Sequence, residues 1–316
     1  MKICSTFAQA TKLIMENKNF DVIIIGGSYA GLSAGMALGR SLRNVLIIDS
    51  GRPCNRQTPH SHNFLTHDGK APQEISRIAR EQVEKYETVK FQDGIVINIV
   101  KNSEGFEVET ETGENFKAKK LIFATGIKDV KPNIKGFEEC WGISVLHCPY
   151  CHGFEVKNEV TGVLANGETG YEFSKLLTNW TKNLTLFTNG KSELTEEQIR
   201  KFNEKNIQIN EDEIDEIKHE NGYIQKLIFK NGKEVELKAL YAKIHLKQNL
   251  DIEKMLGCEL TTEHGLIKID AMHKTNIPGV FACGDNVTMM RSVANAVAQG
   301  NFTGAIINKE LVEEEF

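Results

Sequence analysis

The sequence of 316 residues lacks any apolar run long enough to cross a membrane. A spanning helix needs about 18 such residues, whereas the run Val22-Ile23-Ile24-Ile25 stops at a glycine. It also lacks an excess of basic residues, because 38 Lys and Arg stand against 43 Asp and Glu and give a formal net charge of −5. Such a balance gives no electrostatic reason to bind nucleic acid or anionic lipid. We therefore expect small molecules or other proteins as partners, with no nucleic acid and no membrane.

The seven cysteines do not have the spacing of a disulfide framework. Five of them are scattered along the chain: Cys4, Cys54, Cys140, Cys258 and Cys283. We interpret these as buried small hydrophobic residues, or in the case of Cys4 as a surface thiol. The leader before Asn19 has a polar middle and makes a poor secretory signal. We expect a cytoplasmic protein in which residues 1–18 form an N-terminal extension of unassigned function.

What the sequence has is a glycine-rich turn between a strand and a helix. The run Gly26-Gly27-Ser28-Tyr29-Ala30-Gly31 follows a short β-branched stretch and precedes small and apolar residues that suit a close-packed helix. The next strand ends at Asp49, 23 positions after Gly26. An acid about 20 residues beyond such a turn can reach a ribose hydroxyl, while the glycines let the backbone approach a pyrophosphate. The pattern predicts a dinucleotide-binding turn.

The rest of the chain repeats this plan once. We expect a helix over 72–86, short strands over 89–123 and a hinge near Pro132, followed by a second strand, turn, helix and strand over 160–187. Hairpin turns are predicted at Asn221-Gly222 and Asn231-Gly232. Residues 239–242 are expected to return the chain to the first domain, and residues 294–311 to form a helix. The fold class is therefore α/β with two Rossmann-like (three-layer ββα) domains.

One pair of cysteines looks chemically active. Cys148 and Cys151 form a C-x-x-C pair, and His147 and His152 flank it. Thiols at this spacing can exchange electrons with a nearby flavin, and a neighbouring imidazole can deprotonate an incoming thiol and lower a cysteine pKa.

Together these residues resemble the low-molecular-weight thioredoxin reductase family of class II pyridine nucleotide-disulfide oxidoreductases, over about residues 20–312. The resemblance implies a homodimer with an FAD-binding domain (19–127 and 245–316) interrupted by an inserted NAD(P)-binding-like domain (128–244). It also implies that Cys151 lies nearer the flavin and that Cys148 attacks the external disulfide. The expected FAD-binding residues are Gly26, Ser28, Gly31, Asp49, Thr125, Gly126, Gly284, Asp285, Arg291, Ser292 and Val293.

Departures from the family pattern are equally informative. Ser28 stands where the family has its second glycine, and His152 stands where it has a proton-transferring aspartate. The inserted domain has Ala165 in place of the first glycine of its turn, and Thr188-Asn189-Gly190-Lys191 in place of an arginine cluster for the 2′-phosphate of NADPH. With these losses the chain resembles an atypical branch of the family, which includes gliotoxin-type dithiol oxidases and ferredoxin-linked thioredoxin reductases.

We therefore predict an FAD-dependent dithiol/disulfide oxidoreductase whose Cys148/Cys151 disulfide exchanges electrons with the flavin and with a small dithiol or thioredoxin-like protein. Oxygen or ferredoxin would replace NAD(P)H, whose use is left open. One alternative is a conventional NADPH-dependent thioredoxin reductase. Another is a non-catalytic redox sensor that binds flavin or metal.

The cysteine pair also permits other interpretations. Cys148 to His152 fits the C-x-x-C-H pattern of c-type haem attachment, which requires an exported chain. His147, Cys148, Cys151 and His152 are together a possible zinc set, although consecutive residues rarely point to one tetrahedral centre, and we expect no metal. The loop that contains His60, His62 and His67 reads equally well as solvated surface or as a segment beside the flavin.

Overall fold

The structure is a computed structural model that describes residues 18–316. The predicted N-terminal extension, residues 1–18, lies outside the described residues except for its last one. The chain divides into two compact units. Unit 1 contains residues 18–54, 74–128 and 247–316, and unit 2 contains residues 55–73 and 129–246. Assigning a flavin domain and an inserted nucleotide-type domain to these segments remains a prediction.

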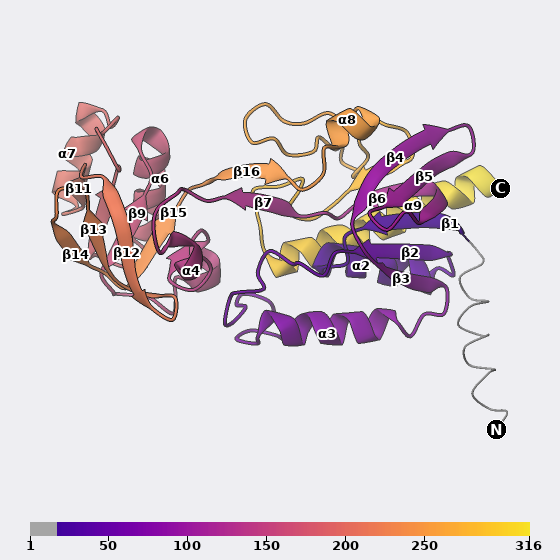
Figure 1. The fold of residues 1–316 in the computed structure, drawn as a ribbon, viewed down its shortest axis with the longest axis horizontal. Coiled ribbons are helices and arrows are strands. Elements are labelled where there is room, and N and C mark those ends of the chain that lie inside the picture. The colour runs from indigo at the N-terminus through magenta and orange to yellow at the C-terminus, as the bar shows by residue number, and fades with distance from the viewer. Residues whose placement is uncertain (1–17) are drawn as a thin grey trace, which may run out of the picture. The chain divides into compact units, whose positions relative to one another are not determined.

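Unit 1 is built on a seven-stranded sheet in the order β3-β2-β1-β6-β5-β4 (Figure 1). The seventh strand, β17, pairs with the last residues of β6, beyond the part of β6 that pairs with β5. Its strands are β1 (Asn19–Ile25), β2 (Val45–Asp49), β3 (Val89–Asp93), β4 (Val96–Asn102), β5 (Gly105–Thr110), β6 (Asn115–Phe123) and β17 (Val280–Ala282). Its helices are α2 (Tyr29–Arg40), α3 (Pro72–Val83, whose first two residues count with unit 2), α8 (Ile252–Leu256) and α9 (Val293–Glu315). Strands β3, β2, β1, β6 and β17 are parallel, so their carboxyl ends lie along one edge of the sheet.

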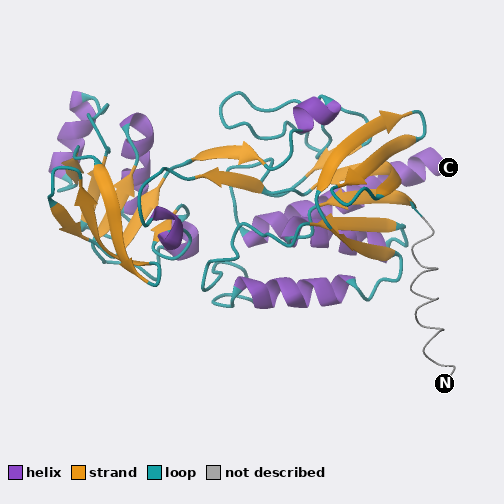
Figure 2. Cartoon of the chain, viewed as in Figure 1, coloured by secondary structure: helices purple, strands orange, loops and turns teal. Residues whose placement is uncertain are grey.

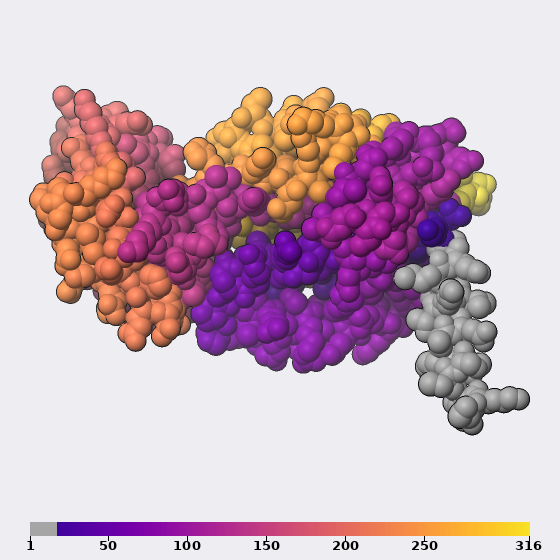
Figure 3. Space-filling model, in the orientation of Figure 1, coloured from indigo at the N-terminus to yellow at the C-terminus, as the bar shows by residue number. Residues whose placement is uncertain are grey.

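The alternation of side chains along β1 explains how unit 1 forms layers. Successive residues of a strand point to opposite faces. Ile23 and Ile25 enter a core cluster with the β4–β5 hairpin and α8, whereas Ile24 faces α2, where a methyl group on Gly35 would approach its Cδ1 to 3.7 Å. Figure 3 shows the α8 region packed on the β4–β5 hairpin within this unit. The sheet is therefore covered on both faces.

Glycines set the distance between α2 and α9, the two helices on the other face. A Cβ atom on Gly300 would lie 2.0 Å from the carbonyl oxygen of Ala30, and one on Gly304 would lie 2.8 Å from that of Ala34. The Ser33 hydroxyl donates a hydrogen bond to the Val297 carbonyl across the same interface. The close approach of the two backbones holds the start of α2 beside α9.

Unit 2 has three layers. Its central sheet is wholly parallel, in the order β11-β10-β9-β15-β8, and a three-stranded antiparallel sheet, β12-β13-β14, packs on one face (Figure 2). Its strands are β8 (Val145–Leu146), β9 (Thr161–Leu164), β10 (Leu184–Phe187), β11 (Gln208–Asn210), β12 (Ile214–Glu220), β13 (Tyr223–Phe229), β14 (Glu234–Glu236) and β15 (Ala239–Ala242). Its helices are α4 (Phe137–Cys140), α5 (Pro149–His152), α6 (Gly167–Leu177) and α7 (Glu196–Glu204).

The α/β class with two Rossmann-like units is confirmed, and so are the predicted hairpins at Asn221-Gly222 and Asn231-Gly232. The expectation that residues 239–242 return the chain to the first domain was wrong. Residues 239–242 form β15, which lies between β9 and β8 inside the parallel sheet of unit 2. The connection is made instead by β7 (Ile127–Val130) and β16 (His245–Gln248), which pair with each other as a two-stranded sheet.

The scattered cysteines are mostly buried in the part of the chain that the structure describes. Cys140, Cys258 and Cys283 are buried, as the sequence predicts, whereas the expectation that Cys54 is buried was wrong, because its side chain is exposed. Cys4 lies outside the described residues. Burial raises the pKa of Cys140 to about 11 and that of Cys283 to about 12, so both remain protonated thiols at neutral pH.

Within residues 18–316, no helix has the length and apolar character needed to cross a membrane.

Candidate functional site

The predicted dinucleotide turn in unit 1 depends on two glycines for steric reasons. Gly26 has φ +108°, and a Cβ atom there would lie 2.2 Å from the carbonyl oxygen of Ala124. A Cβ atom on Gly31 would lie 1.9 Å from the carbonyl oxygen of Gly26. Ser28 is the N-cap of α2, but its hydroxyl makes no capping hydrogen bond. The turn therefore presents backbone rather than side chain at the start of the helix, which is the arrangement that accepts a pyrophosphate.

Asp49 is tied to this turn. It ends β2, and its Oδ1 accepts a hydrogen bond of 3.0 Å from the amide of Gly27. A Cβ atom on Gly27 would lie 2.8 Å from the Asp49 Cβ. A side chain at position 27 would therefore collide with the acid that the Gly27 amide binds. Gly27 was not among the predicted site residues, although its position beside Gly26 was a usable signal.

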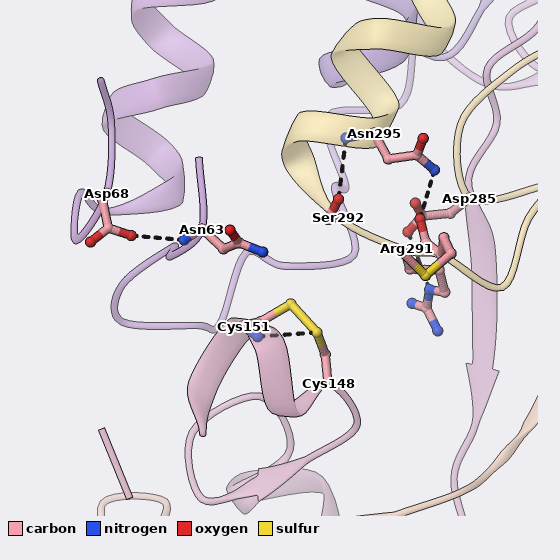
Figure 4. The surroundings of a disulfide bond; sticks show 9 residues. Asn63, Asp68, Cys148, Cys151, Asp285, Arg291, Ser292 and Asn295 are labelled. Carbon is pink, nitrogen blue, oxygen red and sulfur yellow. Dashed lines mark hydrogen bonds and ion pairs between the residues drawn. A yellow bond between two sulfur atoms is a disulfide. The ribbon is translucent and has the colours of Figure 1, made fainter. Parts of the chain in front are cut away.

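A second set of the expected FAD-binding residues lies around the start of α9, in the same unit. Gly284 has φ +90° and donates its amide to Gln299 Oε1 at 2.8 Å. The Asp285 carboxylate is 3.2 Å from Arg291 Nε and accepts a 3.8 Å contact from the Cys54 thiol. Ser292 is the N-cap of α9, with its hydroxyl accepting from the Asn295 amide at 3.1 Å, and Val293 is the first residue of the helix (Figure 4).

Thr125 and Gly126 follow β6 at the same edge of the sheet. The Thr125 hydroxyl accepts from Asn286 Nδ2 at 3.2 Å, its carbonyl accepts from Asn249 Nδ2 at 2.8 Å, and Gly126 has φ +63°. The expected FAD-binding residues thus follow the carboxyl ends of β1, β2, β6 and β17, which are parallel strands of one sheet. Ligands of open α/β sheets bind at that edge. The glycine cradle, the acid tied to it and the α9 start fit a flavin dinucleotide.

The cysteine pair lies in unit 2 and is oxidised. Cys148 and Cys151 form a disulfide with Cα atoms 5.3 Å apart (Figure 4). Cys148 is the N-cap of α5, where its sulfur accepts from the Cys151 amide at 3.2 Å. Pro149 occupies the first helical position, where a missing N–H costs nothing because that amide has no partner within the helix. The short helix therefore brings the two sulfurs together.

Aromatic residues support α5. A Cβ atom on Gly153 would lie 2.6 Å from Trp180 Nε1, so the indole packs directly on the end of this helix. Tyr150, which is 59% exposed, meets Trp180 edge to face with ring centroids 5.5 Å apart. On the other side of the pair, His147 stacks on Trp141 at 5.7 Å. Since the sulfurs are bonded to each other, they do not act as zinc ligands in this state.

His152 is held neutral by its surroundings. Its burial, and secondarily the positive charge that His62 can carry, lower the pKa of His152 to about 4. The two rings meet edge to face with centroids 6.3 Å apart. At neutral pH His152 is therefore a proton acceptor. The contact also shows that part of the 55–73 loop belongs beside the disulfide, a placement that no pattern in the sequence indicated.

The second glycine-rich turn, in unit 2, is closed by its own side chains. Asn166 is the N-cap of α6, and its Oδ1 accepts from the amides of Gly167 at 2.8 Å and Glu193 at 2.9 Å. Its Nδ2 donates to the Lys191 carbonyl at 2.9 Å. The Gly167 amide, at the start of α6 where a pyrophosphate would bind, is therefore already used.

The charge around this turn is unfavourable for a dinucleotide. Glu168 lies in the first turn of α6, and Glu193 Oε2 would be 3.4 Å from a Cβ on Gly167. Glu211 accepts from the Ser192 amide at 2.7 Å. Three carboxylates thus surround a loop whose single cation is the exposed Lys191. These residues do not fit a phosphorylated nicotinamide dinucleotide.

Comparison with known proteins agrees with this architecture. Residues 20–300 match the sequence profile described as pyridine nucleotide-disulphide oxidoreductase. The chain belongs to that family. Its members bind FAD and act on sulfur groups, so the chain is an oxidoreductase of the thioredoxin reductase type.

Three relatives show how far the likeness extends. The thioredoxin reductase tcpT of Claviceps purpurea is 32% identical over 93% of this chain and 95% of its own. An oxidoreductase from Agrobacterium tumefaciens is 37% identical, with a TM-score of 0.88 over 93% of this chain and 99% of that one. A putative thioredoxin reductase TrxB from Bacillus anthracis is 31% identical, with a TM-score of 0.89 over 94% of this chain and 100% of that one.

Proposed function

We propose that this family member is an FAD-dependent dithiol/disulfide oxidoreductase that does not use NADPH as its electron partner. The observation that carries the proposal is the closed turn of unit 2, where Asn166 Oδ1 occupies the Gly167 amide at the start of α6 and ties it to the Glu193 amide. Glu168 and Glu193 add negative charge at the same place. The open turn at Gly26 and the Cys148–Cys151 disulfide are both retained.

The residues that would hold the flavin are the glycine turn with Asp49, Thr125 and Gly126 after β6, and the segment from Gly284 to Val293. When bound, FAD supplies a two-electron acceptor for a thiol pair and a route to an external electron carrier. The amide end of α9, capped by Ser292, offers partial positive charge to a bound anion. Arg291 holds the Asp285 carboxylate in place for a ribityl hydroxyl.

The thiol chemistry belongs to unit 2. A substrate thiolate attacks Cys148 Sγ, the Cys148–Cys151 bond breaks, and Cys151 leaves as a thiolate. The second substrate thiol then attacks the mixed disulfide, which releases the oxidised substrate and leaves Cys148 as a thiolate. Neutral His152, with His147 on the other side, accepts the proton of an incoming thiol. Two electrons pass from substrate to enzyme, and Cys151 would deliver them to the flavin.

The substrate class is a small dithiol or a thioredoxin-like protein, and oxygen or a ferredoxin is the other electron partner. Anaerobic mixing of the purified flavoprotein with dithiothreitol, NADPH or NADH separates the possibilities. Rapid bleaching of flavin absorbance near 450 nm by the dithiol alone supports the proposal, as does oxygen uptake with the dithiol in air. Rapid bleaching by NADPH would instead identify a conventional reductase, and failure of every donor to sustain turnover would indicate a redox sensor.

The variants Cys148→Ser and Cys151→Ser test the disulfide. Each should retain bound flavin and lose at least about 1,000-fold in dithiol turnover, because neither single thiol can form the internal disulfide. Dithionite, which reduces flavin without thiols, should still bleach both variants and so serves as the control. Normal turnover in either variant would remove the disulfide from the mechanism. Light scattering on the same preparations tests the expected homodimer.

A further inference from the structure

In unit 1 the two sets of expected FAD-binding residues meet at a contact between α2 and α9. A Cβ atom on Gly300 of α9 would lie 2.0 Å from the carbonyl oxygen of Ala30. A Cβ atom on Gly284 would lie 3.0 Å from the Cβ of the same alanine. Ala30 belongs to the first glycine-rich turn and Gly284 belongs to the second set, so both sets and α9 converge on this alanine.

Gln299 links the second set to α9 at this point. It precedes Gly300 in the helix, and its Oε1 accepts a hydrogen bond of 2.8 Å from the Gly284 amide. Gly284 is buried and has φ +90°. Because a buried amide without an acceptor is destabilising, the Gln299 side chain stabilises the conformation in which this turn buries its amide.

Asp285, the next residue, is held between two anchors. On one side, Asn286 Nδ2 donates to the Phe123 carbonyl oxygen at 2.8 Å, which ties the segment to the end of β6. On the other side, Gln299 ties it to α9. The Asp285 carboxylate lies 3.2 Å from Arg291 Nε, just before the start of α9 (Figure 4). The direction of this carboxylate therefore depends on the backbone anchors on either side.

The contact between the two helices does not need Gln299. The Ser33 hydroxyl donates to the Val297 carbonyl oxygen at 2.7 Å, and the close backbone approach at Gly300 and Gly304 continues the contact along α9. Loss of the Gln299 amide would leave these contacts in place and release the turn that precedes Asp285. Ser33 is therefore a comparator that belongs to the helix contact but not to the turn.

We propose that Gln299 is a positioning residue for the flavin. By accepting the Gly284 amide beside Ala30, it fixes the segment that carries Asp285 relative to the glycine turn at Gly26. One FAD molecule would have to contact both, the turn through its pyrophosphate and Asp285 through its ribityl chain. A cradle that already has this geometry binds its ligand more tightly than one that must be ordered on binding. The proposal goes beyond the proposed function, because it concerns flavin binding and is the same for any electron partner.

The test uses the complete flavoprotein and compares Gln299→Met, Gln299→Glu, Ser33→Ala and the matched control Asn301→Met. Methionine removes the carbonyl oxygen of the glutamine side chain, whereas glutamate keeps an oxygen acceptor. Asn301 is exposed and lies two positions further along α9, so its replacement repeats the amide-to-methionine change away from the turn. The dissociation constant of FAD is measured from the flavin fluorescence that appears on dilution of the holoprotein. The absorbance spectrum of the bound flavin is the second readout, and circular dichroism on heating shows whether each variant folds.

In Gln299→Met the dissociation constant of FAD should rise at least about 10-fold, because the Gly284 amide loses its acceptor and the Asp285 segment must be reordered on binding. The absorbance bands of the flavin that remains bound should shift, since the carboxylate beside it moves. Gln299→Glu should bind FAD at least about fivefold more tightly than Gln299→Met, because a carboxylate also accepts from an amide. Ser33→Ala should lower the unfolding midpoint without changing the dissociation constant, and Asn301→Met should match the wild type.

A dissociation constant in Gln299→Met equal to that of the wild type would overturn the proposal. Equal weakening in Gln299→Met and Gln299→Glu would contradict it too, because the acceptor is absent from one and present in the other. Equal weakening in Gln299→Met and Ser33→Ala would assign the effect to helix packing and so overturn the role of the turn. Should Gln299→Met fail to fold, Gln299→Asn takes its place; its side chain is one methylene shorter, so weaker FAD binding supports the proposal and unchanged binding overturns it. Failure of the wild type to turn over any dithiol would remove the proposed function and leave these binding measurements intact.

Discussion

The two glycine-rich turns of this chain begin alike and end differently. Each joins a buried parallel strand to a helix, β1 to α2 in unit 1 and β9 to α6 in unit 2. At Gly26 the turn exposes backbone and binds Asp49 through the next amide. At Asn166 a side chain closes the turn with three hydrogen bonds. The same scaffold can therefore present a ligand cradle or a sealed surface, depending on one or two residues.

The last glycine of each turn gives the largest expected contrast. Gly31→Ala places a methyl group 1.9 Å from the Gly26 carbonyl oxygen, which is backbone and cannot move without opening the turn. We expect a loss of at least about 3 kcal/mol in the free energy of unfolding and nearly complete loss of flavin.

The matched variant is Gly170→Ala, whose methyl group would meet Leu186 Cδ1 at 3.1 Å and the Ala165 carbonyl at 3.3 Å. It should cost no more than about 1 kcal/mol, because a side-chain methyl can shift and alanine favours a helix. Thermal denaturation and the ratio of flavin to protein absorbance measure both variants. Equal losses in the two would show that the turns are sterically equivalent after all.

The residue at the end of the second strand of each strand-turn-helix-strand segment gives the next contrast. Asp49→Ala removes a charged acceptor from the Gly27 amide and from the expected ribose contact, and should weaken flavin binding by about 10- to 100-fold. Thr188, which directly follows β10, spends its hydroxyl on the Gly190 carbonyl at 2.6 Å. Thr188→Ala should leave the flavin content unchanged and lower stability by about 1 kcal/mol. Flavin release during equilibrium dialysis measures the first, and chemical denaturation the second.

The contrast also explains what could be predicted from sequence. The positive φ of Gly26 and the contact of Gly31 with the Gly26 carbonyl oxygen are local requirements, so the turn, its helix and Asp49 were all readable from spacing. Residues 239–242 are a short apolar run that any parallel sheet would bury, and nothing local says which neighbours they pair with. Their place between β9 and β8 is a long-range fact that the sequence pattern does not encode.

The candidate site shows the same division. The Cys148–Cys151 pair was predictable because its geometry arises within four consecutive residues. His62 lies about 90 positions from His152, and only the fold brings the two rings together. Likewise, the sequence showed that Ala165 replaces a glycine, but it did not show that the Asn166 side chain fills the turn that this replacement marks.

The smallest expected effect tests whether the second turn is closed by Asn166 alone. Asn166→Ala removes the cap of α6 and its link to Lys191 and Glu193, and should lower the free energy of unfolding by about 1–2 kcal/mol. It should not enable reduction of the flavin by NADPH, because Glu168 and Glu193 still repel a phosphate.

The combined variant Asn166→Gly with Glu168→Gln and Glu193→Gln removes both obstacles, the closed turn and the negative charge. If anaerobic bleaching by NADPH stays absent in the single variant but becomes measurable in the triple variant, charge and closure act together. Bleaching in Asn166→Ala alone would mean that closure of the turn was the only barrier. No bleaching even in the triple variant would place the barrier in the missing arginines of the 188–191 loop.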